Sequence, residues 1–127
     1  MISTVTLAED TTTTETCANG AGIVIEGAVA DANGNKHKYC RSNQQMNWWN
    51  AVSWCDALGR RLFSLDDCAF SVTSTTTCND LKGVVVGEVW IWTSTPSGDS
   101  NAYRVNLSSG TINGSRYRDN YLYALCY

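Results

Sequence analysis

The sequence predicts an α+β fold, and three observations support this prediction. A helical pattern covers residues 47–58, and most of the strand-like segments come after it. Early helices followed by strands are typical of α+β proteins. The chain has 127 residues, 43% of them hydrophobic, which is enough for a single modest core. We therefore expect one domain over residues 17–127, preceded by a tether or an edge strand over residues 1–16.

The first part of the domain predicts two strands. Residues 21–30 are mostly apolar, with β-branched residues among them, as in a strand. Residues 31–35 contain an Asn-Gly pair, which favours a turn. We expect the chain to reverse there and to continue in a second short strand near Lys38 to Arg41.

The clearest helix covers residues 47–58. Asn47 is a good N-cap, and Gly59 can end the helix in the left-handed conformation. Apolar residues at helical spacing predict one buried and one exposed face. The buried face is expected to hold Trp48, Ala51, Val52, Cys55 and Leu58, and the exposed face Asn50, Ser53 and Asp56.

A second, short helix is expected soon afterwards. Ser64 and Asp67 have the Ser-x-x-Asp spacing of a capping box, in which the two residues satisfy each other's backbone N–H groups. The helix would continue through Cys68 and Phe70. The predicted fold therefore has two early helices.

The remaining strands are expected in the second half of the chain. Residues 84–93 are apolar and β-branched, and the Val-Trp-Ile-Trp run at 89–92 predicts a buried central strand. Pro96, the only proline, opens a turn over residues 94–100. We expect a mostly antiparallel sheet completed by strands at residues 102–107, before a Ser-Ser-Gly turn, and at residues 121–127.

Composition narrows the class of protein. The net charge is −3 with nine Lys and Arg residues, which gives no electrostatic reason to expect nucleic acid or an anionic membrane as partner. Six cysteines without a Cys-x-x-Cys pair favour three disulfides and an oxidising compartment over a metal site. The longest apolar stretches are broken by Glu26 and Glu88 and are too short to span a bilayer.

No leader with a basic start and an apolar run follows Met1. Because disulfides form outside the reducing cytosol, we expect this chain to be part of an exported protein, at the cell surface or extracellular. Its natural leader or anchor would then lie outside this sequence.

The sequence offers little for catalysis. His37 is the only histidine and lies between Lys36 and Lys38 in a Gly/Asn-rich loop, so no persuasive Ser/His/Asp arrangement exists. Asp66 and Asp67 are adjacent and belong to the capping turn. Glycine-rich phosphate loops are absent from the sequence. We therefore expect neither an enzyme nor a bound cofactor.

Several segments from about Cys40 to Tyr127 resemble bacterial members of the C-type lectin-like superfamily. More narrowly, they resemble exported proteins whose C-terminal segment is diversified by retroelements, some with pilin-like N-terminal anchors. The matching segments are Met-Asn-Trp-Trp-Asn-Ala-Val-Ser-Trp-Cys at 46–55, Gly-Arg-Arg-Leu-Phe-Ser at 59–64, Val-Trp-Ile-Trp-Thr-Ser-Thr-Pro at 89–96, Ala-Tyr-Arg-Val-Asn-Leu-Ser-Ser-Gly at 102–110 and Tyr-Ala-Leu-Cys at 123–126.

The resemblance implies one disulfide, between the early helix and the last strand. Six cysteines allow 15 pairings, so the other two bridges depend on different arguments. The expected bridges are Cys55–Cys126 from the resemblance, Cys68–Cys78 because these two flank a short Ser/Thr-rich loop, and Cys17–Cys40 as the remaining pair.

The resemblance also implies that residues 111–123 form a displayed, variable binding face. The scaffold around it would be Trp90, Trp92, Val105, Leu107 and Leu125. Tyrosine, arginine and small polar residues in this segment are typical of a paratope. The alternative is a polar surface loop whose tyrosines pack on the sheet. The expected ligand-binding residues are Tyr103, Arg104, Asn113, Ser115, Arg116, Tyr117, Arg118, Asp119, Asn120, Tyr121 and Tyr123.

Calcium-dependent sugar-binding lectins of this fold carry a Glu-Pro-Asn or Gln-Pro-Asp loop and a Trp-Asn-Asp strand motif, and this sequence has neither. Glu88, Asp99 and Asp119 offer oxygen ligands, but without the motif we expect them to be solvated and to bind no metal. The predicted function is non-catalytic recognition of an unknown protein or another surface macromolecule. The alternatives are a structural head domain of a pilin-like surface protein and a calcium-independent carbohydrate-binding lectin.

Overall fold

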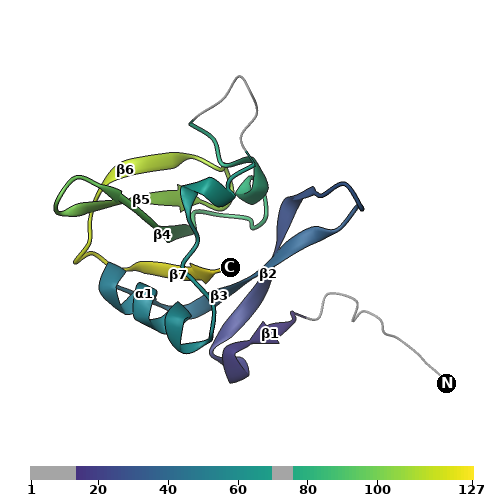
Figure 1. Cartoon of the computed structure of the whole chain (residues 1–127), viewed down its shortest axis with the longest axis horizontal. Helices are drawn as coiled ribbons and strands as arrows, with labels where there is room; N and C mark the ends of the chain where they lie inside the picture. The colour runs from purple at the N-terminus through teal and green to yellow at the C-terminus, as the bar shows by residue number, and fades with distance from the viewer. Residues whose placement is uncertain (1–13, 70–75) are drawn as a thin grey trace.

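A computed structural model describes residues 14–69 and 76–127 (Figure 1). This part of the chain contains one α-helix, α1 (Trp48–Ala57), and three short 3-10 turns: η2 (Ala18–Gly20), η3 (Leu65–Asp67) and η4 (Asn79–Leu81). The strands are β1 (Thr16–Cys17), β2 (Gly22–Ala30), β3 (Lys36–Met46), β4 (Trp90–Ser97), β5 (Asn101–Asn106), β6 (Ile112–Tyr117) and β7 (Leu122–Cys126).

These strands form one seven-stranded sheet in the order β1-β2-β3-β7-β4-β5-β6. Neighbouring strands run antiparallel, except that β4 and β7 are parallel. The last strand, β7, therefore lies in the middle of the sheet with α1 packed beside it (Figure 1). The predicted α+β class and the mostly antiparallel sheet are confirmed.

The first helix begins and ends as predicted. Asn47 Oδ1 accepts the backbone N–H of Asn50 at 2.8 Å. At the other end, the N–H groups of Gly59 and Arg60 donate to the carbonyls of Asp56 and Cys55, which is the Schellman pattern. Gly59 has a φ of 71°, a left-handed conformation that glycine adopts without strain. The predicted outer face, Asn50, Ser53 and Asp56, is exposed.

The prediction of a second helix is wrong. Ser64 and Asp67 do form the capping box, but it closes only the three-residue turn η3. Cys68 is already in an extended conformation, and its side chain is bonded to Cys78. A single turn is costly to nucleate without further helical bonds, and here the disulfide directs the chain elsewhere. Phe70, where the helix was expected to continue, lies outside the described residues.

Two strands start or end elsewhere than predicted. Residues 84–87 form bends and residues 88–89 are irregular, so the strand does not start here; Gly83 and Gly87 adopt φ values of 77° and 94°, which interrupt an extended chain. β4 begins at Trp90 and runs past Pro96, so the turn to β5 covers only residues 98–100. A proline has no backbone N–H to donate to a neighbouring strand. Pro96 is tolerated because β4 pairs with β7 only at Ile91, so no β7 residue lies beside Pro96 to accept such a hydrogen bond.

Three disulfides cross-link the elements, and all three predicted pairs are confirmed. Cys17–Cys40 joins β1 to β3, with Cα atoms 6.0 Å apart. Cys55–Cys126 joins α1 to β7 across 71 residues of sequence. Cys68–Cys78 links two cysteines that are 10 residues apart in the sequence.

The sheet separates two hydrophobic clusters. Adjacent residues of β4 show this arrangement, because Ile91 packs in one cluster and Trp92 in the other, and both are 0% exposed. Phe63, Leu81, Val105, Leu107 and Leu125 belong to the cluster of Ile91. The expected core role of Trp48 and Trp90 holds only in part, since these side chains are half-buried against the cluster of Trp92.

No helix among the described residues is both long and apolar enough to cross a membrane.

Candidate ligand-binding face

The predicted binding segment is held by the edge of the sheet. β6 pairs with β5 through Val105–Ile112, Arg104–Asn113 and Ala102–Arg116. The residues that flank the segment are fixed in the interior, because Val105, Leu107 and Leu125 are each 0% exposed. Sequence reasoning did not assign β6 as a strand. Its side chains face solvent rather than a core, so the usual apolar alternation is missing.

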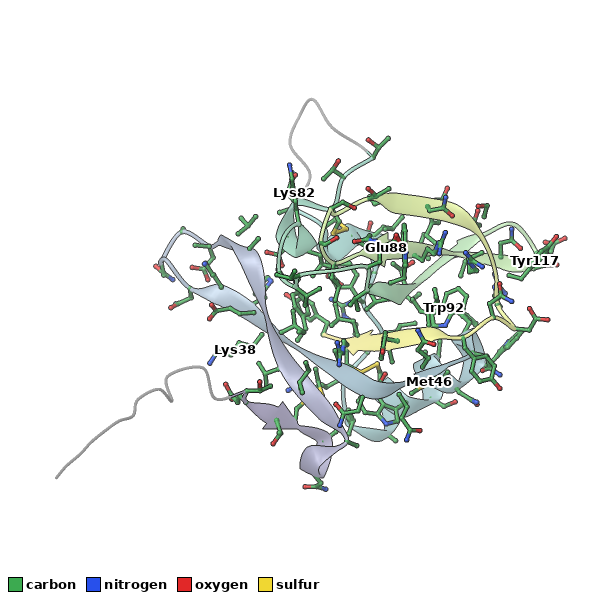
Figure 2. All side chains as sticks on the ribbon, turned by 180° about the vertical axis from the view of Figure 1, so that it is seen from behind. Lys38, Met46, Lys82, Glu88, Trp92 and Tyr117 are labelled. Atoms are coloured by element: carbon green, nitrogen blue, oxygen red, sulfur yellow. A yellow bond between two sulfur atoms is a disulfide. The ribbon has the colours of Figure 1, made fainter. Side chains whose placement is uncertain are left out.

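The side chains of this segment are accessible. Ser115, Tyr117, Asp119 and Tyr121 are exposed, and Asn113, Arg116 and Arg118 are partly buried. Tyr117 and Tyr121 are 60% and 63% exposed, which is unusual for large aromatic side chains. Tyr117 lies at the opposite end of the molecule from Lys38 (Figure 2). The alternative interpretation was a polar surface loop whose tyrosines pack on the sheet. Tyr117 and Tyr121 do not pack in this way, because most of each side chain is exposed.

One group of predicted residues forms a cluster that we call the arginine patch: Trp90, Arg104, Asn113, Arg116 and Asn120. Trp90 and Arg104 are on neighbouring strands, and the guanidinium carbon of Arg104 lies 3.8 Å from the centre of the Trp90 ring. Asn113 is directly opposite Arg104 on β6. Arg116 lies on the same face of β6 as Asn113, although it is three positions further along the strand. The reason is a β-bulge, in which Gly114 and Ser115 of β6 both lie opposite the single residue Tyr103 of β5.

Hydrogen bonds order the patch. Asn113 Oδ1 accepts from the backbone N–H of Ser115 at 3.0 Å, from its hydroxyl at 2.9 Å and from Arg104 Nε at 3.5 Å. Asn120 Oδ1 accepts from Arg116 Nη1 at 3.2 Å. Burial lowers the pKa of Arg104 from its ordinary value, the charge of Arg116 lowers it further, and Glu88 acts in the opposite direction.

A second group of residues lines a pocket at the end of the sheet, which we call the end pocket. Its volume is about 340 Å³. Arg118 is anchored there, because its Nε donates to the carbonyl of Asn101 at 3.1 Å and its Nη2 to that of Gly98 at 3.2 Å. The same guanidinium lies 4.6 Å from the Trp48 ring centre. The pocket is lined by Trp49, Asp99, Ser100, Tyr117, Arg118 and Asp119.

Four of the expected residues belong to neither group: Ser115, which donates to Asn113, the exposed Tyr121, Tyr103 and Tyr123. Tyr103 points to the opposite face of β5 from Arg104, since neighbouring side chains alternate along a strand. A Cβ atom at Gly114 would lie 2.6 Å from the Tyr103 ring, so glycine is needed where β6 passes this tyrosine. Tyr123 packs partly buried against the cluster of Ile91, with Arg41 4.6 Å from its ring centre.

Sequence reasoning did not include Trp49 and Ser100 in the binding face. Trp49 is 53% exposed, although its neighbour Trp48 donates its indole N–H to the carbonyl of Thr93 at 2.8 Å. Consecutive helical residues point about 100° apart, so Trp48, which packs against the sheet, turns Trp49 outward. The exposure of Trp49 could therefore be predicted from the helical spacing in the sequence. The position of Ser100 in the same pocket depends on the tertiary fold.

Within residues 14–69 and 76–127, no three His, Cys, Asp or Glu side chains come together as a metal site. Asp99 and Asp119 both line the end pocket, and Glu88 is exposed beside Arg104. His37 is exposed and lies 3.3 Å from the Tyr127 hydroxyl.

No protein-family model matches this chain, and no curated protein matches its sequence. The function must therefore be inferred from the residues and geometry of the chain itself.

Proposed function

We propose that this protein is a non-catalytic recognition module that presents a variable ligand-binding face on a C-type lectin-like scaffold. The binding surface that we propose comprises the arginine patch, the end pocket and Tyr121. The observation that supports this proposal most directly is the contrast in burial. Tyr117 and Tyr121 are mostly exposed, while Val105, Leu107 and Leu125 on both sides of them in the sequence are fully buried.

This contrast matters because a folded domain gains nothing from two exposed tyrosines. Burial of aromatic surface stabilises a fold, so large exposed aromatics beside a pocket favour a ligand that covers them. Tyrosine and arginine are also the residues that dominate interface hot spots. A rigid sheet edge with separate, accessible side chains lets the binding residues change while the scaffold stays intact.

The three disulfides fit an exported protein. We propose that the protein acts at the cell surface or outside the cell, like the retroelement-diversified proteins that its sequence resembles. The proposed partner is a protein or another surface macromolecule rather than nucleic acid. A reverse transcriptase gene beside the coding sequence, with variation among sister copies concentrated at residues 111–123, would support this origin.

A panning experiment tests the proposal. A random peptide library displayed on phage is selected on the immobilised protein, and the enriched peptides are measured against a face variant, Tyr117→Ser/Asp119→Ser/Tyr121→Ser. We expect binding to weaken by about tenfold or more, with stability changed by about 0.5 kcal/mol or less per exposed site. The control variant, Asn43→Ser/Asp56→Ser/Arg60→Ser, changes exposed residues elsewhere and should bind like the parent.

Two results would contradict the proposal. One is the absence of any enriched peptide, and the other is equal binding by the parent and the face variant. Either result would favour the structural head domain of a pilin-like surface protein.

A calcium-independent carbohydrate-binding function is the second candidate. It is favoured by the end pocket, where the exposed ring of Trp49 lies near Asp99 and Asp119. Carboxylates can accept hydrogen bonds from sugar hydroxyls, and an aromatic face can pack on a sugar ring. A glycan array probed with the parent and with Trp49→Ala distinguishes this function, because only sugar binding through the end pocket would be lost in the variant.

A further inference from the structure

The arginine patch presents hydrogen-bond donors toward solvent. The side-chain oxygens of Asn113 and Asn120 are both engaged by donors within the patch. Both amides are fixed in this orientation, because a backbone N–H and a guanidinium can only donate. Among the described residues, no hydrogen bond engages the Nη groups of Arg104, Nη2 of Arg116 or the amide nitrogens of the two asparagines. A ligand that covers this surface must supply acceptors.

The positive charge of the patch is also unbalanced. Ion pairs among the described residues join Lys38 to Glu15 and Arg61 to Asp67, and none involves Arg104 or Arg116. Glu88 is the carboxylate that acts on Arg104, but it is exposed and makes no ion pair with it. Asp119 lines the end pocket beside Tyr117, whose side chain points away from that of Arg116 along β6. The two arginines repel each other in a chain whose net charge is −3.

The Trp90 ring sets the orientation of one guanidinium. Its centre lies 3.8 Å from Arg104 Cζ, so the ring covers one side of the guanidinium and excludes water there, while the Nη groups make no hydrogen bond among the described residues. The planar fork of a guanidinium matches the two oxygens of a carboxylate. Arg116 is held at one nitrogen by the hydrogen bond that its Nη1 donates to Asn120 Oδ1.

From these observations we propose that the arginine patch binds the carboxylates of an acidic segment in a partner protein. This inference rests on the proposed function and specifies its ligand. A protein is favoured over other polyanions because the patch combines its two arginines with the half-buried Trp90 ring, and the exposed Tyr121 directly follows Asn120 of the patch in the sequence. Arginine together with tryptophan and tyrosine is the composition of hot spots in protein interfaces.

The peptides enriched on the parent protein provide the test. We expect them to be rich in Asp and Glu, and their binding to weaken about tenfold or more in Arg104→Gln and in Arg116→Gln. Arg104→Lys should lose most of this affinity as well, because lysine keeps the charge but not the bidentate fork. Arg60→Gln is the matched control, since it removes the same charge from an exposed site beyond the far end of α1, and it should bind within about twofold of the parent. Thermal melting checks that each variant is folded, and Arg116→Gln keeps the test valid if loss of the Arg104–Trp90 stack impairs folding.

The outcomes separate this inference from the proposed function. Enriched peptides of neutral composition, which bind the face variant poorly but bind Arg104→Gln and Arg116→Gln normally, would overturn the acidic ligand and leave the proposed function intact. Binding of polygalacturonate together with no binding of Glu-rich peptides would overturn the assignment to a protein partner. An absence of all enriched peptides would overturn both.

Discussion

At the scale of single residues, the most constrained group is the carboxylate of Asp80. It is 3% exposed, and it accepts hydrogen bonds from the Tyr39 hydroxyl and, at 2.9 Å, from the backbone N–H of Val29. A Cβ atom at Gly27 would lie 2.6 Å from Asp80 Oδ2, so only glycine lets β2 pass over this side chain. These two hydrogen bonds fix η4, which contains Asp80, against the β2–β3 hairpin, which contains Val29 and Tyr39. Two donors compensate for the cost of burying the carboxylate.

Tyr39→Phe should therefore destabilise the protein. Removal of the hydroxyl leaves the buried Asp80 with one donor fewer, at a cost of about 1–3 kcal/mol in the free energy of unfolding at neutral pH. Chemical denaturation measures this value. Tyr121→Phe is the control, because it removes a hydroxyl from an exposed side chain and should change stability by less than about 0.5 kcal/mol.

Tyr39 should also make the stability of the protein depend on pH in the alkaline range. Burial, followed by the hydrogen bond to Asp80 and its charge, raises the pKa of Tyr39 above its ordinary value. Above pH ~10 the unfolded chain releases this proton while the native protein keeps it. The stabilising contribution is complete below that pH and is lost as pH rises. The difference in the free energy of unfolding between the parent and Tyr39→Phe should therefore decrease over the same pH range. A difference that stays constant up to pH ~11 would contradict this account.

The tryptophans differ sharply in what they contribute. Trp92 is 0% exposed and donates its indole N–H to the carbonyl of Met46 at 2.9 Å, whereas Trp49 is 53% exposed. Trp92→Ala should cost about 3–5 kcal/mol through lost burial and the cavity that remains. Trp49→Ala should leave the melting temperature nearly unchanged. If both variants melt alike, the assignment of Trp92 to the core is wrong.

At the scale of elements, α1 depends on signals at its two ends. The Asn47 side chain satisfies one of the N–H groups that no helical carbonyl can reach, and the Schellman turn at Gly59 satisfies carbonyls at the other end. The start of α1 also contacts the candidate binding face, because the backbone N–H of Trp48 donates to the Arg118 carbonyl at 2.8 Å. A change at the cap would therefore reach the end pocket.

Asn47→Ala should reduce stability by about 1 kcal/mol, the typical value of an N-cap. Asn50→Ala offers a close comparison, since Asn50 is exposed on the same helix and alanine has the higher helix propensity. That variant should be as stable as the parent or slightly more stable. Equal destabilisation by both substitutions in a denaturant titration would show that the Asn47 side chain does not act as a cap.

At the scale of the whole molecule, cross-links stabilise a small core. Cys55–Cys126 spans 71 residues and Cys68–Cys78 spans 10. In the chain-entropy description, the longer loop contributes about 4 kcal/mol and the shorter one about 3 kcal/mol. The double variant Cys55→Ala/Cys126→Ala should thus lose more stability than Cys68→Ala/Cys78→Ala, as read from their guanidinium midpoints. The reverse order would show that local structure around Cys68 outweighs loop length.

Calcium should have no effect on stability. The sequence lacks the calcium motifs of sugar-binding lectins, so we expect the melting temperature to be the same with millimolar calcium and with a chelator. A bound ion would stabilise the native state by mass action and raise the melting temperature as its concentration increases. A shift of several degrees would therefore contradict this expectation.

The sequence alone determined the features that depend on neighbouring residues. Helix α1 begins after Asn47 and ends before Gly59, and the capping box at Ser64 is present. The Asn-Gly turn within residues 31–35 joins β2 to β3. These predictions succeeded because capping and turn formation involve residues a few positions apart. The length of the turn after Ser64 was not predictable in this way, since a disulfide to Cys78 decides it.

The tertiary structure decided everything that depends on pairing between distant segments. β7 lies between β3 and β4 although it is last in the chain, and β6 becomes a strand only because β5 offers it an edge. The arginine patch exists because strand register places Arg104 over Trp90 and opposite Asn113. Side-chain composition predicted that this segment would be exposed, as Tyr117 and Tyr121 are, but the grouping of its residues follows from long-range register, which no local pattern encodes.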